Sequence, residues 1–210
     1  MCLSQNKLAS SAEFPLFETI AVIDRQFQQL AYHQQRMDKA MQGYFGVENP
    51  FKLADILAIP DDLSEGLVRC KVAYNERDFH VQFFAYQPRE IRSFHLVHSE
   101  NLDYRFKYSD RRQLDALKNA NYDEVIIIHH GFVSDCTIGN LLFLKQGKWY
   151  SPTHYLLKGT QLTQLIEQGK VTLVEIREQD LPAYEQIMLI NALNPFDPAR
   201  AVPISAITSG

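Results

Sequence analysis

The order of strand-like and helix-like segments is the feature that most restricts the fold of this 210-residue chain. Apolar residues alternate over some stretches and recur every three or four residues over others, as in strands and amphipathic helices respectively. The two kinds of segment lack the regular alternation that builds a parallel α/β sheet, which favours an α+β fold. The expected strands are 17–23, 66–74, 79–86, 91–97, 125–128, 132–135, 140–144, 171–176 and 187–190, with hairpin turns at 75–78 and 146–148, and the expected helices are about 27–44, 51–57, 111–118 and 160–168.

The chain is expected to divide into two domains. A polar stretch at 98–103 separates halves with different strand and helix patterns, which predicts a boundary between residues 87 and 103. The expected domains are a small N-terminal α/β domain, 1–95, and a larger C-terminal domain, 104–210. Residues 199–210 are expected to form a loose tail.

Composition excludes several classes of function. The chain is 46% hydrophobic, enough for a sizeable core, and its net charge of -4 offers no basic field for nucleic acid. Its three cysteines, Cys2, Cys70 and Cys136, form no Cys-x-x-Cys pair and are expected to be reduced thiols. No run approaches the roughly 20 apolar residues of a membrane helix, and residues 1–11 lack the apolar segment of a signal peptide. A cytoplasmic protein without a membrane partner is therefore expected.

Lys107 begins the pentapeptide Lys-Tyr-Ser-Asp-Arg. The flanking Tyr104, Phe106 and Tyr108 would give it an apolar, partly buried setting. Burial favours the uncharged amine, which is the form that makes a Schiff base with an aldehyde. The alternative for Lys107 is a solvated lysine that precedes a helix.

Residues in three further segments fit a pyridoxal 5′-phosphate (PLP) site. Asp135 follows a strand and could pair with the pyridine nitrogen, or could be a turn aspartate. Gly159 and Thr160 open a predicted helix whose free N–H groups could hold a phosphate, or could form an ordinary N-cap. Arg36 could clamp the same phosphate, or could lie on the polar face of its helix.

No metal site is expected. His129 and His130 are adjacent, and adjacent side chains of an extended chain point to opposite faces. They would therefore not converge on one ion. The sequence also has no Gly-rich phosphate loop and no Gly-x-Ser-x-Gly motif.

Taken in order, these segments resemble the class IV aminotransferases, the fold-type IV family of PLP enzymes, over about 17–196. That family includes branched-chain and D-amino acid aminotransferases and aminodeoxychorismate lyase. The motifs that carry the resemblance are Phe-Glu-Thr at 17–19, His-x-x-Arg-Met at 33–37, the lysine pentapeptide at 107–111, the segment 131–143, Trp-Tyr-Ser-Pro at 149–152 and Asn-Ala-Leu-Asn-Pro at 191–195.

The resemblance implies a two-domain, D-amino acid aminotransferase-like architecture in which the C-terminal domain binds PLP. Lys107 would carry the cofactor and then act as the acid and base at the substrate. The other cofactor contacts that it implies are Arg36, Asp135, Gly159, Thr160, Asn191 and Ala192. Thr19 falls where the lyases have a threonine assigned to proton transfer, and Arg69, on a strand beside the expected cleft, is a candidate for binding a substrate carboxylate or a surface arginine.

The segment 191–195 resembles the lyases more than the transaminases, which have a loop containing Gly-Thr there. The resemblance therefore implies a homodimeric lyase that releases pyruvate and 4-aminobenzoate in folate synthesis, with a small amino acid or an aminodeoxychorismate-like compound as substrate. Asp135 replaces a glutamate, and 159–162 lacks a threonine and an arginine. Two alternatives stay open: a branched-chain or D-amino acid aminotransferase-like activity, and a non-catalytic protein that binds PLP or another anion.

Overall fold

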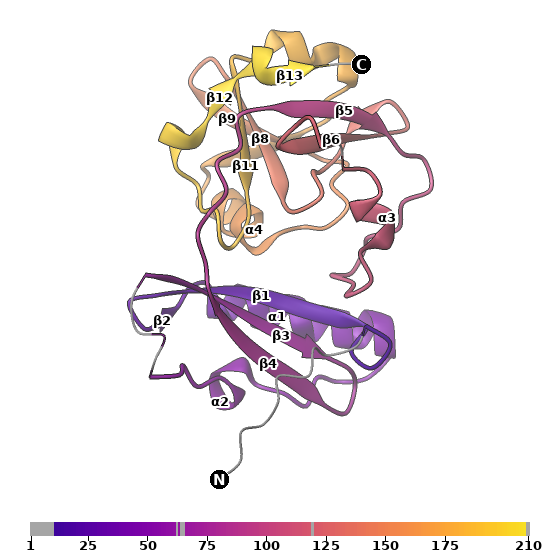
Figure 1. Ribbon diagram of the computed structural model, residues 1–210. Coiled ribbons are helices and arrows are strands. Elements are labelled where there is room, and N and C mark those ends of the chain that lie inside the picture. Colours follow the sequence, from indigo (N-terminus) through magenta and orange to yellow (C-terminus); the bar gives the residue numbers. More distant parts are fainter. Residues whose placement is uncertain (1–10, 62, 64–65, 119, 209–210) are drawn as a thin grey trace.

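The computed structural model describes residues 11–61, 63, 66–118 and 120–208, so the cysteine at position 2 lies outside the described residues. The chain forms two lobes, one above the other in Figure 1, with one sheet in the lower lobe and two in the upper lobe. Strands and helices are mixed in both lobes, and the predicted α+β class is confirmed. In the described part of the chain, no helix has the length and apolar character needed to cross a membrane.

The lower lobe is an antiparallel sheet in the order β2-β1-β3-β4, covered on one face by a helix. The hairpin predicted around 75–78 is confirmed, because β3 and β4 pair from Val68↔Ala85 to Tyr74↔Phe79. The elements of this lobe are β1 (Leu16–Ile23), β2 (Gln26–Phe27), α1 (Leu30–Ala40), the π-helical turn η1 (Met41–Phe45), α2 (Leu53–Ile56), β3 (Leu67–Tyr74) and β4 (Phe79–Ala85).

The two faces of β1 have different roles. Leu16, Ile20 and Val22 are buried against α1 in the core of the lobe. Since side chains alternate along a strand, Phe17 and Thr19 lie on the opposite face. They line a cavity between the lobes, so β1 separates the core of the lower lobe from the candidate site.

The predicted helix from 27 to 44 is wrong at its start, and its last turn is π-helical. Asp24 and Arg25 have φ values of 48° and 59°, which is the two-residue turn that suits a tight hairpin, and the chain returns as β2 before α1 begins. At the other end the helix widens into η1, where Gly43 packs against Phe106 so closely that a Cβ would lie 2.9 Å from the ring. The turn at Asp24 and Arg25 contains no glycine, and Phe106 is 63 residues from Gly43 in the sequence. The periodicity of apolar residues therefore could not indicate either feature.

The upper lobe packs two sheets against each other, in the orders β10-β9-β8-β11-β12 and β13-β5-β6-β7. Its core lies between them and includes Phe94, Ile126, Ile128, Phe143 and Ile187. The division of the chain at 87–103 stays a prediction. The elements are β5 (Phe94–His98), α3 (Arg112–Asp115), β6 (Glu124–His129), β7 (Phe132–Val133), β8 (Asn140–Lys145), β9 (Lys148–Pro152), α4 (Thr160–Glu167), β10 (Val171–Val174), η2 (Glu178–Ala183) and β11 (Gln186–Ile190).

The predicted loose tail is wrong for the described residues up to 208. The chain there forms η3 (Pro198–Arg200), β12 (Val202–Pro203), η4 (Ile204–Ala206) and β13 (Ile207–Thr208). Strand β12 pairs with β11, β13 pairs in parallel with β5, and Val202, Ile204 and Ile207 pack on the core. Strands of two residues are too short to show an alternating pattern, which is why the sequence did not reveal them.

His129 and His130 were expected to point to opposite faces of an extended chain, and this expectation is wrong. His130 has a φ of 50°, so the chain turns there instead of continuing as a strand. The two imidazole rings meet edge to face with centroids 4.2 Å apart, and together with Glu100 they place three possible metal-ligand atoms within 4.8 Å of one another.

Candidate active site

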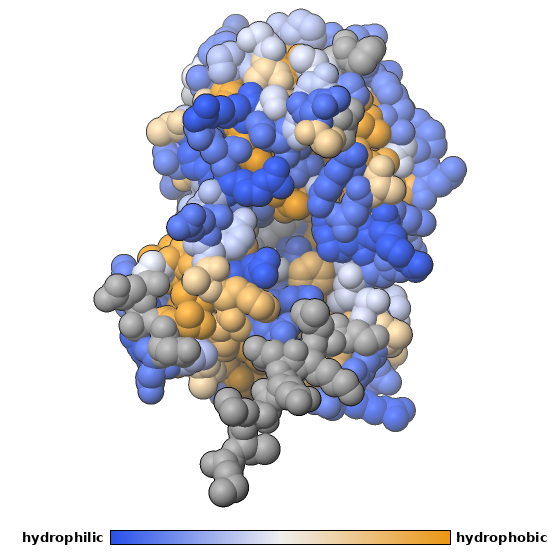
Figure 2. Space-filling view, in the orientation of Figure 1, coloured by the Kyte–Doolittle hydropathy of each residue, from blue (hydrophilic) through white to orange (hydrophobic). Residues whose placement is uncertain are grey.

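A cavity of about 360 Å³ lies between the two lobes, within the size range of small-molecule sites. Figure 2 shows the surface hollowed at this level. All nine residues that the sequence singles out for chemistry line this cavity: Thr19, Arg36, Arg69, Lys107, Asp135, Gly159, Thr160, Asn191 and Ala192. They come from segments that are up to 173 positions apart, so the fold brings the predicted set together.

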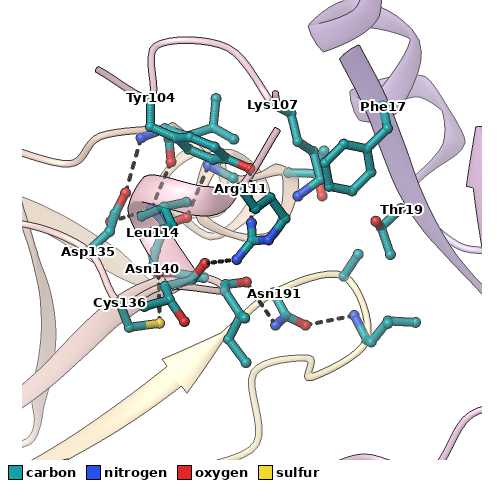
Figure 3. Close-up of a pocket in the computed structure, with 18 of the residues that line it drawn as sticks. Phe17, Thr19, Tyr104, Lys107, Arg111, Leu114, Asp135, Cys136, Asn140 and Asn191 are labelled. Carbon is teal, nitrogen blue, oxygen red and sulfur yellow. Dashed lines mark hydrogen bonds between the residues drawn. The ribbon is translucent and has the colours of Figure 1, made fainter. Parts of the chain in front are cut away.

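Lys107 is held in place by backbone pairing with β1. Its carbonyl accepts a hydrogen bond from the Phe17 N–H at 3.0 Å, and the Ser109 N–H donates to the carbonyl of Pro15 at 2.7 Å. The Lys107 Nζ lies 4.7 Å from the centroid of the Phe17 ring. Figure 3 shows these two side chains next to each other. The segment therefore extends the edge of β1 and directs the amine into the space between the lobes.

The environment of Lys107 favours the uncharged amine. Burial, followed by repulsion from Arg36, lowers the pKa of Lys107 from 10.5 to about 7. Among the described residues, no carboxylate lies within ion-pair distance of its Nζ. At neutral pH a large fraction of the amine is therefore unprotonated and nucleophilic.

The depressed pKa predicts how the stability of the cofactor-free protein depends on pH. The unfolded chain keeps a proton on Lys107 up to about pH 10.5, whereas the folded chain releases it near pH 7, so the contribution of this group to stability falls as pH decreases through that window. Lys107→Met should therefore raise the free energy of unfolding at pH 7 by at most about 5 kcal/mol, with no gain left near pH 10.5. Urea unfolding at several pH values measures this. Lys39→Met, which removes an exposed lysine on α1, is the control.

Arg36 is fixed by a buried ion pair that the sequence analysis missed. Its Nε donates to Glu18 Oε1 at 2.9 Å and its Nη2 donates to Glu18 Oε2 at 2.5 Å. His33 Nδ1 contacts Glu18 Oε2 at 2.7 Å. Burial alone would raise the pKa of Glu18, but Arg36 and the hydrogen bonds from His33 and Arg36 outweigh it and lower that pKa to about 2. Glu18 is therefore ionised, and it clamps the Arg36 guanidinium at the cavity wall.

Glu18→Gln is expected to weaken this clamp. A buried guanidinium that loses its carboxylate typically costs about 3–5 kcal/mol, so the variant should unfold at a lower urea concentration. The Arg36 guanidinium would also lose its fixed position in the cavity wall, and the Kd for inorganic phosphate should rise roughly tenfold. Glu167→Gln is a matched control, because Glu167, at the end of α4, accepts an exposed hydrogen bond from Tyr32 of α1. An unchanged Kd in Glu18→Gln would contradict the role of Glu18 in placing Arg36.

Asp135 is a buried carboxyl group with three protein donors. Its Oδ2 accepts the N–H groups of Leu156 and Leu157 at 2.9 and 3.0 Å, and its Oδ1 accepts the Asn140 Nδ2 at 2.8 Å. Burial raises its pKa from 3.8 to about 7, and these hydrogen bonds only partly oppose that rise. A carboxylate has about four acceptor positions, so one is left for a donor from the cavity. A cationic donor there would favour the ionised form.

The start of α4 offers fewer free donors than the sequence suggests. The Gly159 N–H already donates to Asn140 Oδ1 at 3.0 Å, and a Cβ on Gly159 would lie 2.4 Å from that oxygen. Gly159 is therefore needed for close packing on Asn140, and its amide is not available for a phosphate. Thr160 and Gln161, in the first turn of α4, keep N–H groups that have no partner within the helix.

The loop at Asn191 is built by its own side chain. Asn191 Oδ1 accepts the N–H groups of Leu193 and Asn194, both at 2.9 Å, and its Nδ2 donates to the Ile138 carbonyl at 3.1 Å. This side chain is therefore committed to the shape of the loop. The neighbouring Ala192 and Leu193 also line the cavity.

Arg111 is a further cavity residue without a role in the sequence analysis. Its Nη2 donates to the Thr137 carbonyl at 2.7 Å and its Nη1 donates to the Tyr104 hydroxyl at 3.0 Å. It thus ties the segment after Lys107 to the loop that carries Asp135, and it lies between these two residues in Figure 3. The positive charge of Arg111 also contributes to the lowered pKa of Lys107.

Comparison with known proteins identifies the family of this chain. The model of the family described as amino-transferase class IV matches residues 15–206. The chain belongs to this family. A protein of Haemophilus influenzae without an assigned function is 36% identical over 185 residues, which cover 86% of this chain and 98% of that protein.

Two solved structures show how far the likeness extends within the class IV aminotransferases. A Haemophilus somnus protein, provisionally named as a 4-amino-4-deoxychorismate lyase, is 42% identical, with a TM-score of 0.83 over 88% of this chain and 98% of that chain. A hypothetical aminotransferase from Mycobacterium tuberculosis, bound to alpha-ketoglutarate and PMP, is 16% identical, with a TM-score of 0.72 over 99% of this chain and 86% of that chain. The second likeness shows the shared fold alone.

The family is PLP-dependent, and the residues of this cavity fit that cofactor. The cavity holds a buried amine on Lys107 with a depressed pKa, and a buried carboxyl on Asp135 with an acceptor position to spare. It also holds a cation at Arg36 beside the free amides of α4. Ser109 Oγ, in the same wall, is buried and has no hydrogen-bond partner among the described residues, so the site has a polar atom left for a ligand.

Proposed function

We propose that this chain is a PLP enzyme with aminodeoxychorismate lyase-like activity, which releases pyruvate and 4-aminobenzoate from its substrate. The observation that carries the proposal is that one cavity is lined by both Lys107 and Asp135, whose pKa values burial shifts to about 7 from opposite sides. Perturbed titratable groups that meet in a cleft are characteristic of catalytic sites. The cofactor, when bound, would supply an electron sink for the bonds broken at the substrate.

Each of the predicted site residues then has a role in the proposed reaction. Lys107 would bond the cofactor and afterwards hold or move the proton at the reacting carbon. Asp135 would keep the pyridine nitrogen protonated. The phosphate would be bound by the Arg36 guanidinium, the free amides at Thr160 and Gln161, and the Ala192 backbone, while Gly159 and Asn191 shape these segments. Thr19 would contact the substrate, and Arg69 would bind a carboxylate.

The lyase reaction is favoured over transamination by two observations. The Haemophilus somnus relative with 42% identity is provisionally named as a lyase. The segment 191–195 resembles that of the lyases, and in the structure the Asn191 side chain closes the loop through three hydrogen bonds to Leu193 and Asn194. A transaminase-like activity is the second candidate, because the family and its fold serve both reactions.

Product analysis tests this proposal. The PLP-loaded protein is incubated with aminodeoxychorismate, and pyruvate and 4-aminobenzoate are measured together. Both products should appear in equal amounts, and none should form with Lys107→Ala. A second incubation supplies a branched-chain or D-amino acid with 2-oxoglutarate. Turnover there without lyase products would establish the aminotransferase, and a loaded protein inactive in both incubations would support a non-catalytic PLP-binding protein.

We also propose that the enzyme is a cytoplasmic homodimer that acts in folate synthesis. The family and the provisional name of the Haemophilus somnus relative support this proposal. Light scattering of the purified protein should give twice the mass of the 24.2 kDa chain. A monomer that turns over its substrate would contradict the dimer.

A further inference from the structure

The side chains that line the cavity carry more positive than negative charge. Five cationic side chains line it, from Arg36, Arg69, Lys71, Lys107 and Arg111, whereas the one carboxyl group in its lining is Asp135. Three of the five have a task or a partner. Arg36 is paired with Glu18, Arg111 is paired with Asp115 and bonded to Tyr104 and Thr137, and Lys107 is the reactive amine.

The two remaining cations, Arg69 and Lys71, lie on one face of β3. They are two residues apart, so their side chains leave the strand on the same side. The register with β1 pairs Ala21 with Arg69 and Thr19 with Lys71, which places both cations on the face that carries Thr19. Both line the cavity. No sequence motif indicated a role for Lys71.

Aromatic rings support the two cations, and no acid neutralises them. The Arg69 guanidinium lies 4.6 Å from the centroid of the Phe84 ring and 5.9 Å from that of Tyr86. The Lys71 Nζ lies 5.3 Å from the centroid of Phe17, the same ring that lies beside the Lys107 amine. In the described part of the chain, neither cation forms an ion pair, and the buried Arg69 Nε has no hydrogen-bond partner.

This arrangement is unfavourable until an anion enters. Burial, followed by repulsion from Arg69, lowers the pKa of Lys71. Two half-buried like charges and an unpartnered donor each cost free energy that one carboxylate would recover. The guanidinium fork accommodates a planar carboxylate, and the ammonium group adds a point charge beside it. The rings of Phe17 and Tyr86 offer flat apolar surface for the body of the same molecule.

We propose that Arg69 and Lys71 together form a carboxylate seat, and that the substrate is a ring-containing amine whose carboxylate binds in this seat while its amino group faces Lys107. Lys71 is therefore a specificity-determining residue of the cleft. The proposal rests on the proposed function for the position of the reacting amine. The seat itself is defined by the two cations and their aromatic supports.

A pair of probes that differ only in charge tests the seat in the PLP-loaded protein. The probes are 4-aminobenzoate and its neutral isostere 4-aminobenzamide, and calorimetry measures both Kd values. The wild type should bind the carboxylate at least tenfold more tightly than the amide. Lys71→Met should remove most of this preference by weakening the carboxylate alone, whereas Lys71→Arg should keep it. An intact visible absorption band in each variant shows that the protein is folded and loaded.

Two outcomes would overturn the seat. One is equal affinity of the wild type for both probes, and the other is an unchanged preference in Lys71→Met and Arg69→Met together. A failure of the lyase proposal would be seen differently, as absence of pyruvate and 4-aminobenzoate from aminodeoxychorismate with the charge preference of the wild type still present. With an active lyase, Lys71→Met should raise KM about tenfold or more while kcat changes far less.

Discussion

Purified Lys107→Ala, mixed with PLP, should show no visible absorption band beyond that of free PLP and should have no measurable turnover. The amine of Lys107 is the buried primary amine that enters the cavity with a pKa of about 7, and an alanine leaves nothing in its place to bond an aldehyde. Loss of a nucleophile that also transfers the proton is expected to lower kcat by at least about a thousandfold. Absorbance spectroscopy and the product assay measure the two effects.

Lys39→Ala is the control for Lys107→Ala, because Lys39 is exposed on α1 and does not line the cavity. It should keep the band and the activity. Added methylamine should restore part of the activity of Lys107→Ala if the cavity is otherwise intact. A visible band of full intensity in Lys107→Ala would mean that another lysine carries the cofactor.

Asp135→Asn should give the second-largest effect, a fall in kcat on the order of a hundredfold and weaker PLP binding. The charge of Asp135 would hold a proton on the pyridine nitrogen, and a neutral amide cannot do so. A hydrogen bond to a charged group is worth about 1.5–3 kcal/mol, which corresponds to roughly ten- to a hundredfold in affinity. Titration of the cofactor-free protein with PLP and the product assay measure the two effects.

Asp135→Glu separates the charge from the shape of this site. It keeps the carboxylate and should retain much more activity than Asp135→Asn, although it lengthens a side chain that bonds to Asn140, Leu156 and Leu157. The far-ultraviolet circular dichroism of both variants should match the wild type. Equal activity of Asp135→Asn and the wild type would exclude a role for the charge.

The fold could be predicted where apolar patterns are long. The β3–β4 hairpin, the buried strand around Ile126 and the helix that begins at Thr160 were all visible in the sequence, because each carries several alternating or periodic apolar residues. The β1–β2 hairpin was missed, since Asp24 and Arg25 adopt a turn that usually requires glycine or asparagine. The ordered C-terminal segment was missed because its strands are held by partners far away in the sequence.

The residues that line the cavity could be predicted as a set, but the hydrogen bonds and ion pairs among them could not. The lining of one cavity by all nine residues agrees with the motifs, whereas Glu18 and Asn140 were overlooked. A signal for Glu18 did exist, because it lies between Leu16 and Ile20 on the apolar face of a strand, where a carboxylate needs a partner. The bond from Gly159 to Asn140 joins residues 19 positions apart, and no sequence pattern indicates that this amide is already occupied.

The role of Lys107 as the residue that bonds PLP can be tested by locating the site of covalent attachment. The wild-type protein is incubated with PLP and reduced with sodium borohydride, which makes a bond between PLP and an amine permanent, and is then digested for mass spectrometry. We expect one modified peptide, with the pyridoxyl phosphate group on Lys107. Modification of another lysine, or of none, would contradict it.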